Sequence, residues 1–394
     1  MKQKNSFFSR LFLLVWGILS TFQVMANAET PQDNLEKYDS IEVSLLTCSP
    51  HEEIYSLYGH TALRWHDLHQ SGPSAGNDIA FNWGIFNFNK PYFVLRFVFG
   101  LTDYELGIMP FQYFCTYYEK WGSSVTEQVL NLSNEEKMKL EAALQKNLLP
   151  ENRIYRYNYF YDNCSTRPRN IIEECINGKV EYAQREDYTP SYREMVGVCT
   201  RNHPWGTFGN DILLGIKADF KTDMRQQEFL PDNLLYDFDR AQIYADGTYR
   251  PLVKERRMVV LPGVQIIEKD FPLTPTECAV VLLIVALLLR GLEWKLKKVF
   301  VWWDVLLMLA QGLAGCVLFA MIFSQHPTTS LNLQILLLNP LPLFFIPSII
   351  RGKKTKWQNL LLVLVVLFFI GSLFQHYAEG MLILALSLLS RFRR

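Results

Sequence analysis

The stretch Asp162-Asn163-Cys164-Ser165-Thr166, read together with Tyr58-Gly59-His60 earlier in the chain, decides the fold. A short helix is expected from Thr166 to Ile176, because Pro168 fits only in a first turn, where its nitrogen has no bond to make. Cys164 then lies at the N-terminus of this helix, where the positive end of the macrodipole favours a thiolate. A cysteine nucleophile needs a base, which a histidine elsewhere in the chain supplies. The two stretches therefore predict thiol-based acyl chemistry.

The beginning of the chain is typical of a secretory signal peptide. Three basic residues precede the apolar run Leu11–Met25, and the small residues Ala26-Asn27-Ala28 suit cleavage. We therefore expect residues 1–28 to be a signal peptide and Glu29 to begin the mature chain. An uncleaved signal anchor is the alternative, and in both cases the residues that follow are exported.

A membrane domain is expected at residues 274–394, where the composition becomes strongly apolar. Clusters of Lys and Arg follow the first, third and last apolar stretches, whereas residues 299–350 and 357–390 contain neither. The positive-inside rule then predicts five spans, with the chain entering from the outside and ending in the cytoplasm. The five stretches are Cys278–Leu289, Val299–Phe323, Leu331–Ile350, Leu360–Phe374 and Met381–Leu389. Buried helices of a water-soluble protein, the alternative, do not explain this alternation of charge.

Residues 39–270 are expected to form one exported domain of mixed α+β class. Close spacing of the strands favours antiparallel pairing. A helix is predicted at Asn134–Asn147, capped by Ser133. The predicted strands are Ile41–Leu46, Thr61–Trp65, Ile79–Phe86, Ser124–Leu130 and Arg156–Phe160. The net charge of zero is an average over two different parts of the chain and says nothing about nucleic acid, but no basic stripe appears, so nucleic acid is not an expected partner.

Two hypotheses fit Cys164: it is a nucleophile, or it forms one half of a disulfide. The exported part contains five cysteines, and an odd number in an oxidising compartment leaves one thiol unpaired unless it bonds another chain. The positive potential that Arg167 and Arg169 add beside the helix start suits a thiolate better than a disulfide. We therefore favour the nucleophile.

His60 is the predicted base. It begins a strand after Gly59, and small residues follow it, whereas His66 and His69 lie in what we expect to be a loop. Papain-like enzymes place their base on a strand that faces the nucleophilic helix, and the residue that orients the ring commonly comes from the next strand. Asn82 is the candidate for that third role, and a structural amide at a strand edge is its alternative.

The order of the two residues is informative, because the histidine precedes the cysteine here, the reverse of papain. This order fits the circularly permuted branch of the NlpC-type papain-like superfamily, which includes lecithin–retinol acyltransferase. Lecithin–retinol acyltransferase carries an acyl group on its cysteine as a thioester.

Several motifs in this order resemble the Bacteroides-type lipoprotein N-acyltransferases, the Lnb family. The resemblance covers residues 40 to 270, and the membrane region that follows also fits. It is carried by Tyr58-Gly59-His60-Thr61-Ala62-Leu63-Arg64, Phe81-Asn82-Trp83-Gly84, Glu127-Gln128-Val129-Leu130-Asn131-Leu132, Asp162-Asn163-Cys164-Ser165-Thr166-Arg167 and Gly209-Asn210-Asp211-Ile212-Leu213-Leu214-Gly215. Asn170 stands where the family usually has Asp, which puts a contact on the helix surface in doubt but not the chemistry.

The resemblance implies the final step of lipoprotein maturation. An acyl chain moves from a membrane phospholipid to the α-amine of a diacylglyceryl-modified cysteine, through a thioester on Cys164 with His60 as base. Arg167 or Arg169 would hold the phosphate, with a solvated helix face as the alternative for Arg169. The remaining candidates for substrate contact are Tyr58 and Asn163. No cofactor is expected, and no ligand spacing indicates a metal.

Two apolar segments, residues 91–100 and 109–114, are expected either to be core or to dip into the bilayer and line an acyl channel. Two other functions fit the same sequence. A membrane-anchored cysteine peptidase or amidase acting on cell-wall peptide would use the same Cys164 and His60. A non-catalytic receptor or scaffold would bind lipid or peptide and would hold Cys164 in a disulfide.

Overall fold

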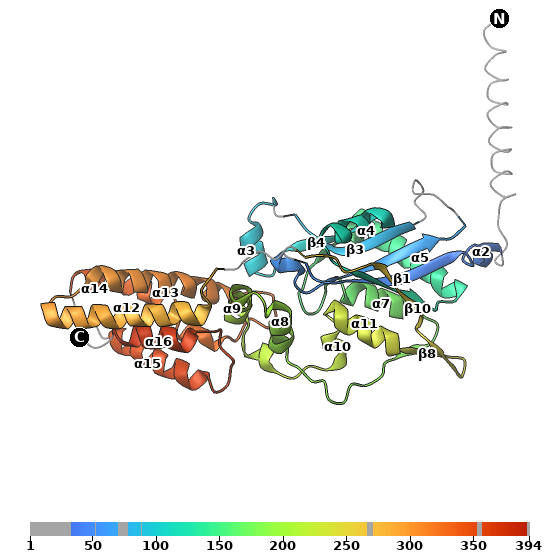
Figure 1. The fold of residues 1–394 in the computed structure, drawn as a ribbon. Helices are drawn as coiled ribbons and strands as arrows, with labels where there is room; N and C mark the ends of the chain where they lie inside the picture. Colours follow the sequence, from blue (N-terminus) through green and yellow to red (C-terminus); the bar gives the residue numbers. More distant parts are fainter. Residues whose placement is uncertain are drawn as a thin grey trace, which may run out of the picture.

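The computed structural model describes residues 33–51, 53–69, 78–87, 89–265, 271–352 and 357–391. The expected signal peptide, residues 1–28, lies outside them. Figure 1 shows the exported part and the helices of the membrane part at opposite ends of an elongated molecule. Between them lie α8 (Tyr192–Thr200) and α9 (Pro204–Leu213).

A seven-stranded antiparallel sheet with the order β10-β5-β1-β2-β3-β4-β6 organises the exported domain. Its strands are β1 (Ile41–Cys48), β2 (His60–Asp67), β3 (Asp78–Ile85), β4 (Asp103–Pro110), β5 (Val125–Leu130), β6 (Ile154–Arg156) and β10 (Val253–Val260). Four of the predicted strands lie within one or two residues of these bounds. The strand predicted at Arg156–Phe160 is wrong, because β6 ends at Arg156 and the chain turns back at the bridge between Asn158 and Asp162. His66, expected in a loop, belongs to β2.

Both faces of the sheet are covered, so its central strands β1 and β5 are buried on both sides. Along β1, Leu45 and Leu46 point to opposite faces and join different apolar clusters, as the two-residue period of a strand requires. The Leu45 cluster includes side chains of α5 (Asn134–Leu148), α7 (Thr166–Cys175) and α11 (Pro231–Arg240). The Leu46 cluster includes α4 (Phe111–Lys120), which lies on the other side of the sheet in Figure 1.

The predicted helix at Asn134–Asn147 is α5, which ends one residue later. The Ser133 hydroxyl accepts from the Glu136 N–H, and the Glu136 carboxylate accepts from the Ser133 N–H. This reciprocal pair satisfies two backbone donors that a helix start otherwise leaves without partners.

The two apolar segments have different structures. Residues 109–114 end β4 and begin α4, and Phe111 and Phe114 are buried in the core under the sheet. Residues 91–100 contain the short helix α3 (Phe93–Val98), where Leu95 and Phe97 are 57% and 45% exposed. The core interpretation therefore holds for Phe111 and Phe114 of the second segment but not for its exposed Tyr113, and the first segment presents apolar side chains at the surface.

The Glu127-Gln128 motif has a structural role. Glu127 is fully buried and accepts from Arg64 at 2.8 Å and from Arg257 at 2.6 Å. Burial raises the pKa of Glu127, but the two guanidinium groups outweigh it and lower the pKa overall. The motif therefore links β2, β5 and β10 by a buried ion-pair network.

Several short elements complete the exported domain. They are α2 (Asp33–Glu36), η1 (Ile54–Ser56), α6 (Pro150–Arg153), η2 (Ile216–Asp219), α10 (Met224–Gln227) and a three-stranded sheet of β7 (Lys179–Glu181), β8 (Gln242–Ala245) and β9 (Thr248–Pro251). None of these short helices or strands was predicted.

The membrane domain is helical and contains three segments, among its described residues, that are long and apolar enough to span a bilayer. These are α12 (Pro275–Leu296), α13 (Val301–Met321) and the segment Leu333–Ile350, which comprises η3 (Leu333–Leu336) and α14 (Leu341–Ile350). The last two predicted spans correspond to shorter helices, α15 (Trp357–Gly371) and α16 (Met381–Leu389).

Buried hydrogen bonds fasten the exported domain to the membrane domain. The amides of Asn332 and Gln334 donate to the carbonyls of Ile212 and Asp211, and the Gln375 amide donates to that of Leu214. These carbonyls belong to the end of α9, and carbonyls at a helix end need partners from outside the helix. The two domains therefore share one hydrogen-bonded junction.

Candidate active site

Cys164 lies immediately before α7, where the Asn163 side chain holds the chain. The Asn163 carbonyl oxygen accepts from the N–H groups of Ser165 at 2.8 Å and Thr166 at 3.0 Å. Its amide nitrogen donates to the carbonyls of Tyr159 and Phe229. Asn163 thus satisfies the first donors of the helix and fixes the turn that presents the thiol at the helix N-terminus.

His60 begins β2 directly after a glycine that no other residue can easily replace. Gly59 has φ +74°, and a Cβ there would lie 2.7 Å from the carbonyl oxygen of Cys48. Cys48 is the register partner of His60 in the β1–β2 pair. The close approach of the two strands at Gly59 therefore sets where the imidazole begins.

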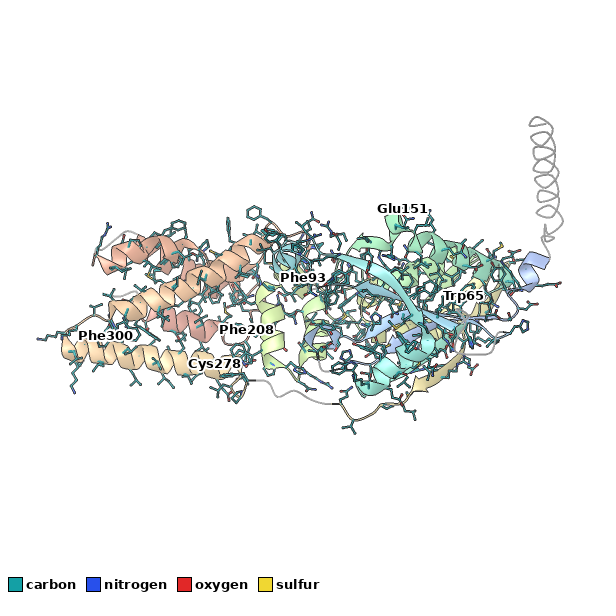
Figure 2. The ribbon with its side chains drawn as sticks, turned by 90° about the horizontal axis from the view of Figure 1, so that it is seen from above. Trp65, Phe93, Glu151, Phe208, Cys278 and Phe300 are labelled. Carbon is teal, nitrogen blue, oxygen red and sulfur yellow. The ribbon has the colours of Figure 1, made fainter. Side chains whose placement is uncertain are left out.

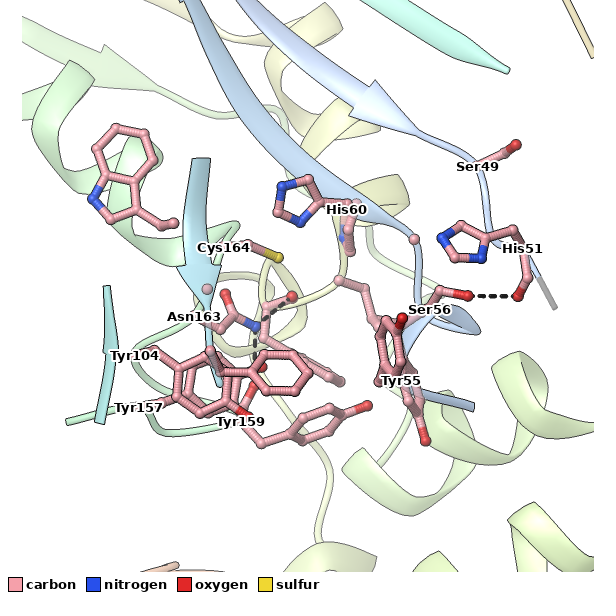
Figure 3. Close-up of a pocket in the computed structure, with 18 of the residues that line it drawn as sticks. Ser49, His51, Tyr55, Ser56, His60, Tyr104, Tyr157, Tyr159, Asn163 and Cys164 are labelled. Atoms are coloured by element: carbon pink, nitrogen blue, oxygen red, sulfur yellow. Dashed lines mark hydrogen bonds between the residues drawn. The ribbon is translucent and has the colours of Figure 1, made fainter. Parts of the chain in front are cut away.

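His60, Asn82 and Cys164 meet although they come from β2, β3 and the start of α7. The Nε2 of His60 lies 3.2 Å from Oδ1 of Asn82, and the His60 ring and the Cys164 thiol each shift the pKa of the other. Figure 3 shows the Cys164 sulfur beside the His60 ring. Since an amide oxygen only accepts, Nε2 carries the proton in this contact, which leaves Nδ1 of a neutral ring without one. This is the tautomer that a base toward Cys164 needs.

The electrostatics of the pair favour charge separation. Burial raises the pKa of the Cys164 thiol, but the His60 charge and hydrogen bond, the Thr61 backbone N–H and the Ser165 hydroxyl together lower it. Burial lowers the pKa of His60, but the Cys164 thiolate and the bond to Asn82 raise it overall. The two shifts are opposite in sign, as expected for a thiolate–imidazolium pair.

Cys164 differs in this respect from the other cysteines of the exported domain. All seven cysteines of the chain lie among the described residues, and each is a free thiol. Burial raises the pKa of Cys115, Cys175 and Cys199 to about 11 and that of Cys48 well above its usual value. Among these five thiols, Cys164 alone has a lowered pKa, and it forms no disulfide in this structure.

A cavity of about 200 Å³ opens over Cys164 and His60 (Figure 3). Half of its lining residues are aromatic, and His60 and His51 are the only side chains in the lining that can carry a positive charge. The aromatic residues are Tyr55, Tyr58, Trp83, Phe86, Tyr104, Tyr117, Tyr118, Tyr157, Tyr159 and Phe229. A lining of this kind suits an apolar chain with an uncharged polar group.

The predicted contact residues Tyr58 and Asn163 both line this cavity. The Tyr58 hydroxyl accepts from the Asn210 amide of α9 at 2.9 Å, and burial raises the pKa of Tyr58 to about 12, so that it stays protonated. Asn163 already uses both its amide nitrogen and its carbonyl oxygen in the bonds described above. Its role is to position Cys164, and Tyr58 remains the candidate for substrate contact.

The structure does not bring Arg167 and Arg169 to the cavity. Arg167 pairs with Asp162 through two bonds of 2.6 and 2.8 Å and stacks on the Tyr155 ring. Arg169 is only 5% exposed and pairs with the fully buried Glu228 at 2.7 Å. Both predictions for Arg169 are wrong: it neither faces the cavity, where a phosphate would bind, nor lies on a solvated helix face, because its charge is buried in an ion pair.

His51 lines the cavity but is not among the site residues predicted from the sequence. It is 6% exposed, stacks on Trp121 at 4.9 Å, and its Nδ1 has no hydrogen-bond partner among the described residues. Burial and then the His60 charge lower its pKa, which keeps it neutral. Its position just after β1, opposite the histidine strand, is the only signal that would have found it.

The comparisons with known proteins agree with this architecture. A family model described as the Lnb N-terminal periplasmic domain matches residues 29–197, and one described as the Lnb transmembrane domain matches residues 266–393. No curated protein and no solved structure matches the chain. The matches leave only residues 198–265 between them, in the order that the motifs predicted. The chain therefore belongs to the Lnb family.

Proposed function

We propose that this protein is a lipoprotein N-acyltransferase that carries an acyl chain on Cys164 as a thioester. The observation that supports it most directly is the His60–Cys164 pair, with its opposite pKa shifts, at the floor of an uncharged aromatic cavity. The donor is a membrane phospholipid, and the acceptor is the α-amine of a diacylglyceryl-cysteine lipoprotein.

In the first half-reaction the Cys164 thiolate attacks the ester carbonyl of the phospholipid. A C–S bond forms, the C–O bond breaks, and the His60 imidazolium gives its proton to the departing lysophospholipid oxygen. The N–H groups of Ser165 and Thr166 are held by Asn163, which leaves the N–H of Cys164 as the helix-mouth donor toward the oxyanion.

In the second half-reaction the lipoprotein amine attacks the thioester. His60, now neutral, accepts the proton of the amine through Nδ1. The proton on Nε2 stays on the ring and is donated to the Asn82 carbonyl oxygen, which stabilises the resulting imidazolium. The C–S bond breaks as the amide C–N bond forms, which returns the thiolate–imidazolium pair. Both half-reactions use the same two residues and require no cofactor.

The fold and the membrane topology extend this proposal. The antiparallel sheet, the histidine strand before the cysteine helix and the amide on the next strand support a circularly permuted papain-like domain. The charge pattern supports five spans with a cytoplasmic C-terminus, so that the exported domain lies on the periplasmic side of the inner membrane. In that arrangement the shorter helices α15 and α16 cross with the help of flanking residues.

The test compares intact masses of N-terminal lipopeptides from cells that carry the wild-type protein, Cys164→Ala or no protein. We expect a third acyl chain with the wild-type protein and its absence in the other two. The proposal is overturned if the third acyl chain persists in Cys164→Ala cells that have no other enzyme for this step. A changed cell-wall peptide profile with unchanged lipopeptides supports a peptidase or amidase instead.

A further inference from the structure

A line of aromatic rings leads from the cavity to the membrane domain. Phe86 lines the cavity, and its ring stacks on Phe93 of α3 with centroids 5.9 Å apart. Phe93 stacks on Phe97 at 6.5 Å, and Phe97 meets the ring of His326 at 6.0 Å. We call Phe86, Phe93, Phe97 and His326 the aromatic ladder. Figure 2 shows Phe93 on α3, near the outer ends of the membrane helices.

The membrane end of the ladder is fixed in place. The Gln325 N–H donates to the carbonyl of Phe99, and the His326 ring meets the carbonyl of Phe97 at 3.3 Å. At Gly100, which has φ +66°, a Cβ would lie only 3.2 Å from Gln325. Both partners follow the end of α13 that faces the exported domain, so α3 is held at the outer surface of the membrane domain.

The surface of α3 is apolar beyond what a water-exposed helix needs. Leu95 and Phe97 are 57% and 45% exposed, and Tyr92, which precedes the helix, is 77% exposed. On the neighbouring end of α13, Phe323 is 64% exposed. These side chains together form an apolar surface at the level where a bilayer would begin, and such surfaces are typical of segments that lie in a lipid interface.

The charges beside α3 favour an anionic lipid headgroup. Arg96 of α3 and Arg156 of β6 share a single carboxylate, Asp103, at 2.5 and 2.9 Å. Two guanidinium groups with one counter-ion leave a net positive charge next to the apolar surface. A phosphate with an acyl chain attached complements both features.

We propose that the donor phospholipid enters from the outer leaflet at α3 and that its acyl chain reaches Cys164 along the aromatic ladder. This inference rests on the proposed function, since it names the route that the donor takes to the same cysteine. The ladder provides an apolar path from the bilayer to the cavity. Without such a path, the acyl chain would have to cross water to reach Cys164.

The experiment measures single-turnover acylation of Cys164 in the full-length protein, by intact mass, with two donors. One donor is a phosphatidylethanolamine–phosphatidylglycerol vesicle that contains the reconstituted protein, and the other is water-soluble p-nitrophenyl acetate. Phe93→Ala interrupts the ladder, and Leu95→Asp places a charge on the apolar surface. Tyr113→Asp, at a 71% exposed aromatic on α4 away from the ladder, is the matched control.

We expect the two α3 variants to slow acylation from vesicles about tenfold or more, which corresponds to 1.4 kcal/mol in the barrier. Their rates with p-nitrophenyl acetate should stay within about twofold of wild type, and Tyr113→Asp should match wild type with both donors. Equal loss with both donors, or no loss with vesicles, overturns the ladder. A slower transfer to the lipoprotein amine with normal acylation assigns the ladder to the acceptor and also overturns it. A wild-type protein that vesicles do not acylate at all contradicts the proposed function itself.

Discussion

The carbonyl oxygen of Asn82 lies 3.2 Å from Nε2 of His60 and accepts a hydrogen bond from it. A residue on β3 thus holds the His60 ring, which lies beside Cys164 (Figure 3). Without the amide, neither tautomer of the ring is preferred by this contact.

Asn82→Ala should lower the kcat of acyl transfer by about 100-fold and leave KM nearly unchanged, because a positioned base contributes that much or more. The His60 pKa should fall, since the bond to Asn82 raises it. Measuring kcat and KM across pH tests both effects. Asn82→Asp keeps an acceptor at Nε2 and should retain more activity than Asn82→Ala. Equal loss in the two variants would contradict the tautomer role.

Cys164 should react first among the cysteines of the exported domain when the protein is treated with iodoacetamide near neutral pH. Its pKa is lowered, whereas burial raises the pKa of Cys115, Cys175 and Cys199 to about 11. The rate of alkylation should rise with pH at values below the ordinary thiol pKa, because the thiolate is the reacting form. In His60→Ala this rise should move to higher pH, because the variant lacks the charge that lowers the pKa of Cys164. Peptide mapping by mass spectrometry gives the order, and preferential labelling of Cys115 would refute it.

Gly59→Ala should impair acyl transfer far more than Gly247→Ala does. Both glycines have positive φ, +74° at Gly59 and +78° at Gly247. A Cβ at Gly59 would meet a backbone carbonyl, whereas a Cβ at Gly247 would have no atom within 4 Å. The backbone strain, about 1–3 kcal/mol, is common to both. Comparing thermal unfolding and activity of the two variants separates strain from the displacement of His60. Similar activities in the two would argue against a displaced imidazole.

Arg169→Met should destabilise the exported domain without changing KM for phospholipid. It leaves Glu228 buried without its main partner, and breaking such a pair costs about 3–5 kcal/mol. Burial already raises the pKa of Glu228 to about 7, so the variant should regain stability as the pH is lowered and Glu228 takes up a proton. Urea unfolding at several pH values measures this effect. A raised KM with unchanged stability would contradict this prediction and would indicate that Arg169 binds the substrate.

The sequence predicted those parts of the fold that local chemistry determines. The capping pair of Ser133 and Glu136 marks the start of α5, and the alternation of side chains in β1 marks its strand. The turn after Arg156 carries no comparable signal, because Tyr157 and Tyr159, which line the cavity, are equally well suited to a strand.

For the site, proximity in sequence was both informative and misleading. Cys164, His60 and Asn82 were found because each has a recognisable position on a helix start or strand. Arg167 and Arg169 were predicted because they are near Cys164 in the sequence, but residues at successive positions of a helix point in different directions around its axis. Their partners Asp162 and Glu228 could be assigned only once the chain was folded.

The junction at α9 has a consequence for how this molecule can be divided. Asn332, Gln334 and Gln375 supply the donors for carbonyls at the base of the exported domain. One turn away, Asn210 of α9 holds the hydroxyl of Tyr58 in the cavity wall. The exported domain released on its own would lose three hydrogen-bond donors at the end of α9, the helix that also positions Tyr58. The membrane helices thus serve as a structural support for the exported domain, in addition to any role in the bilayer.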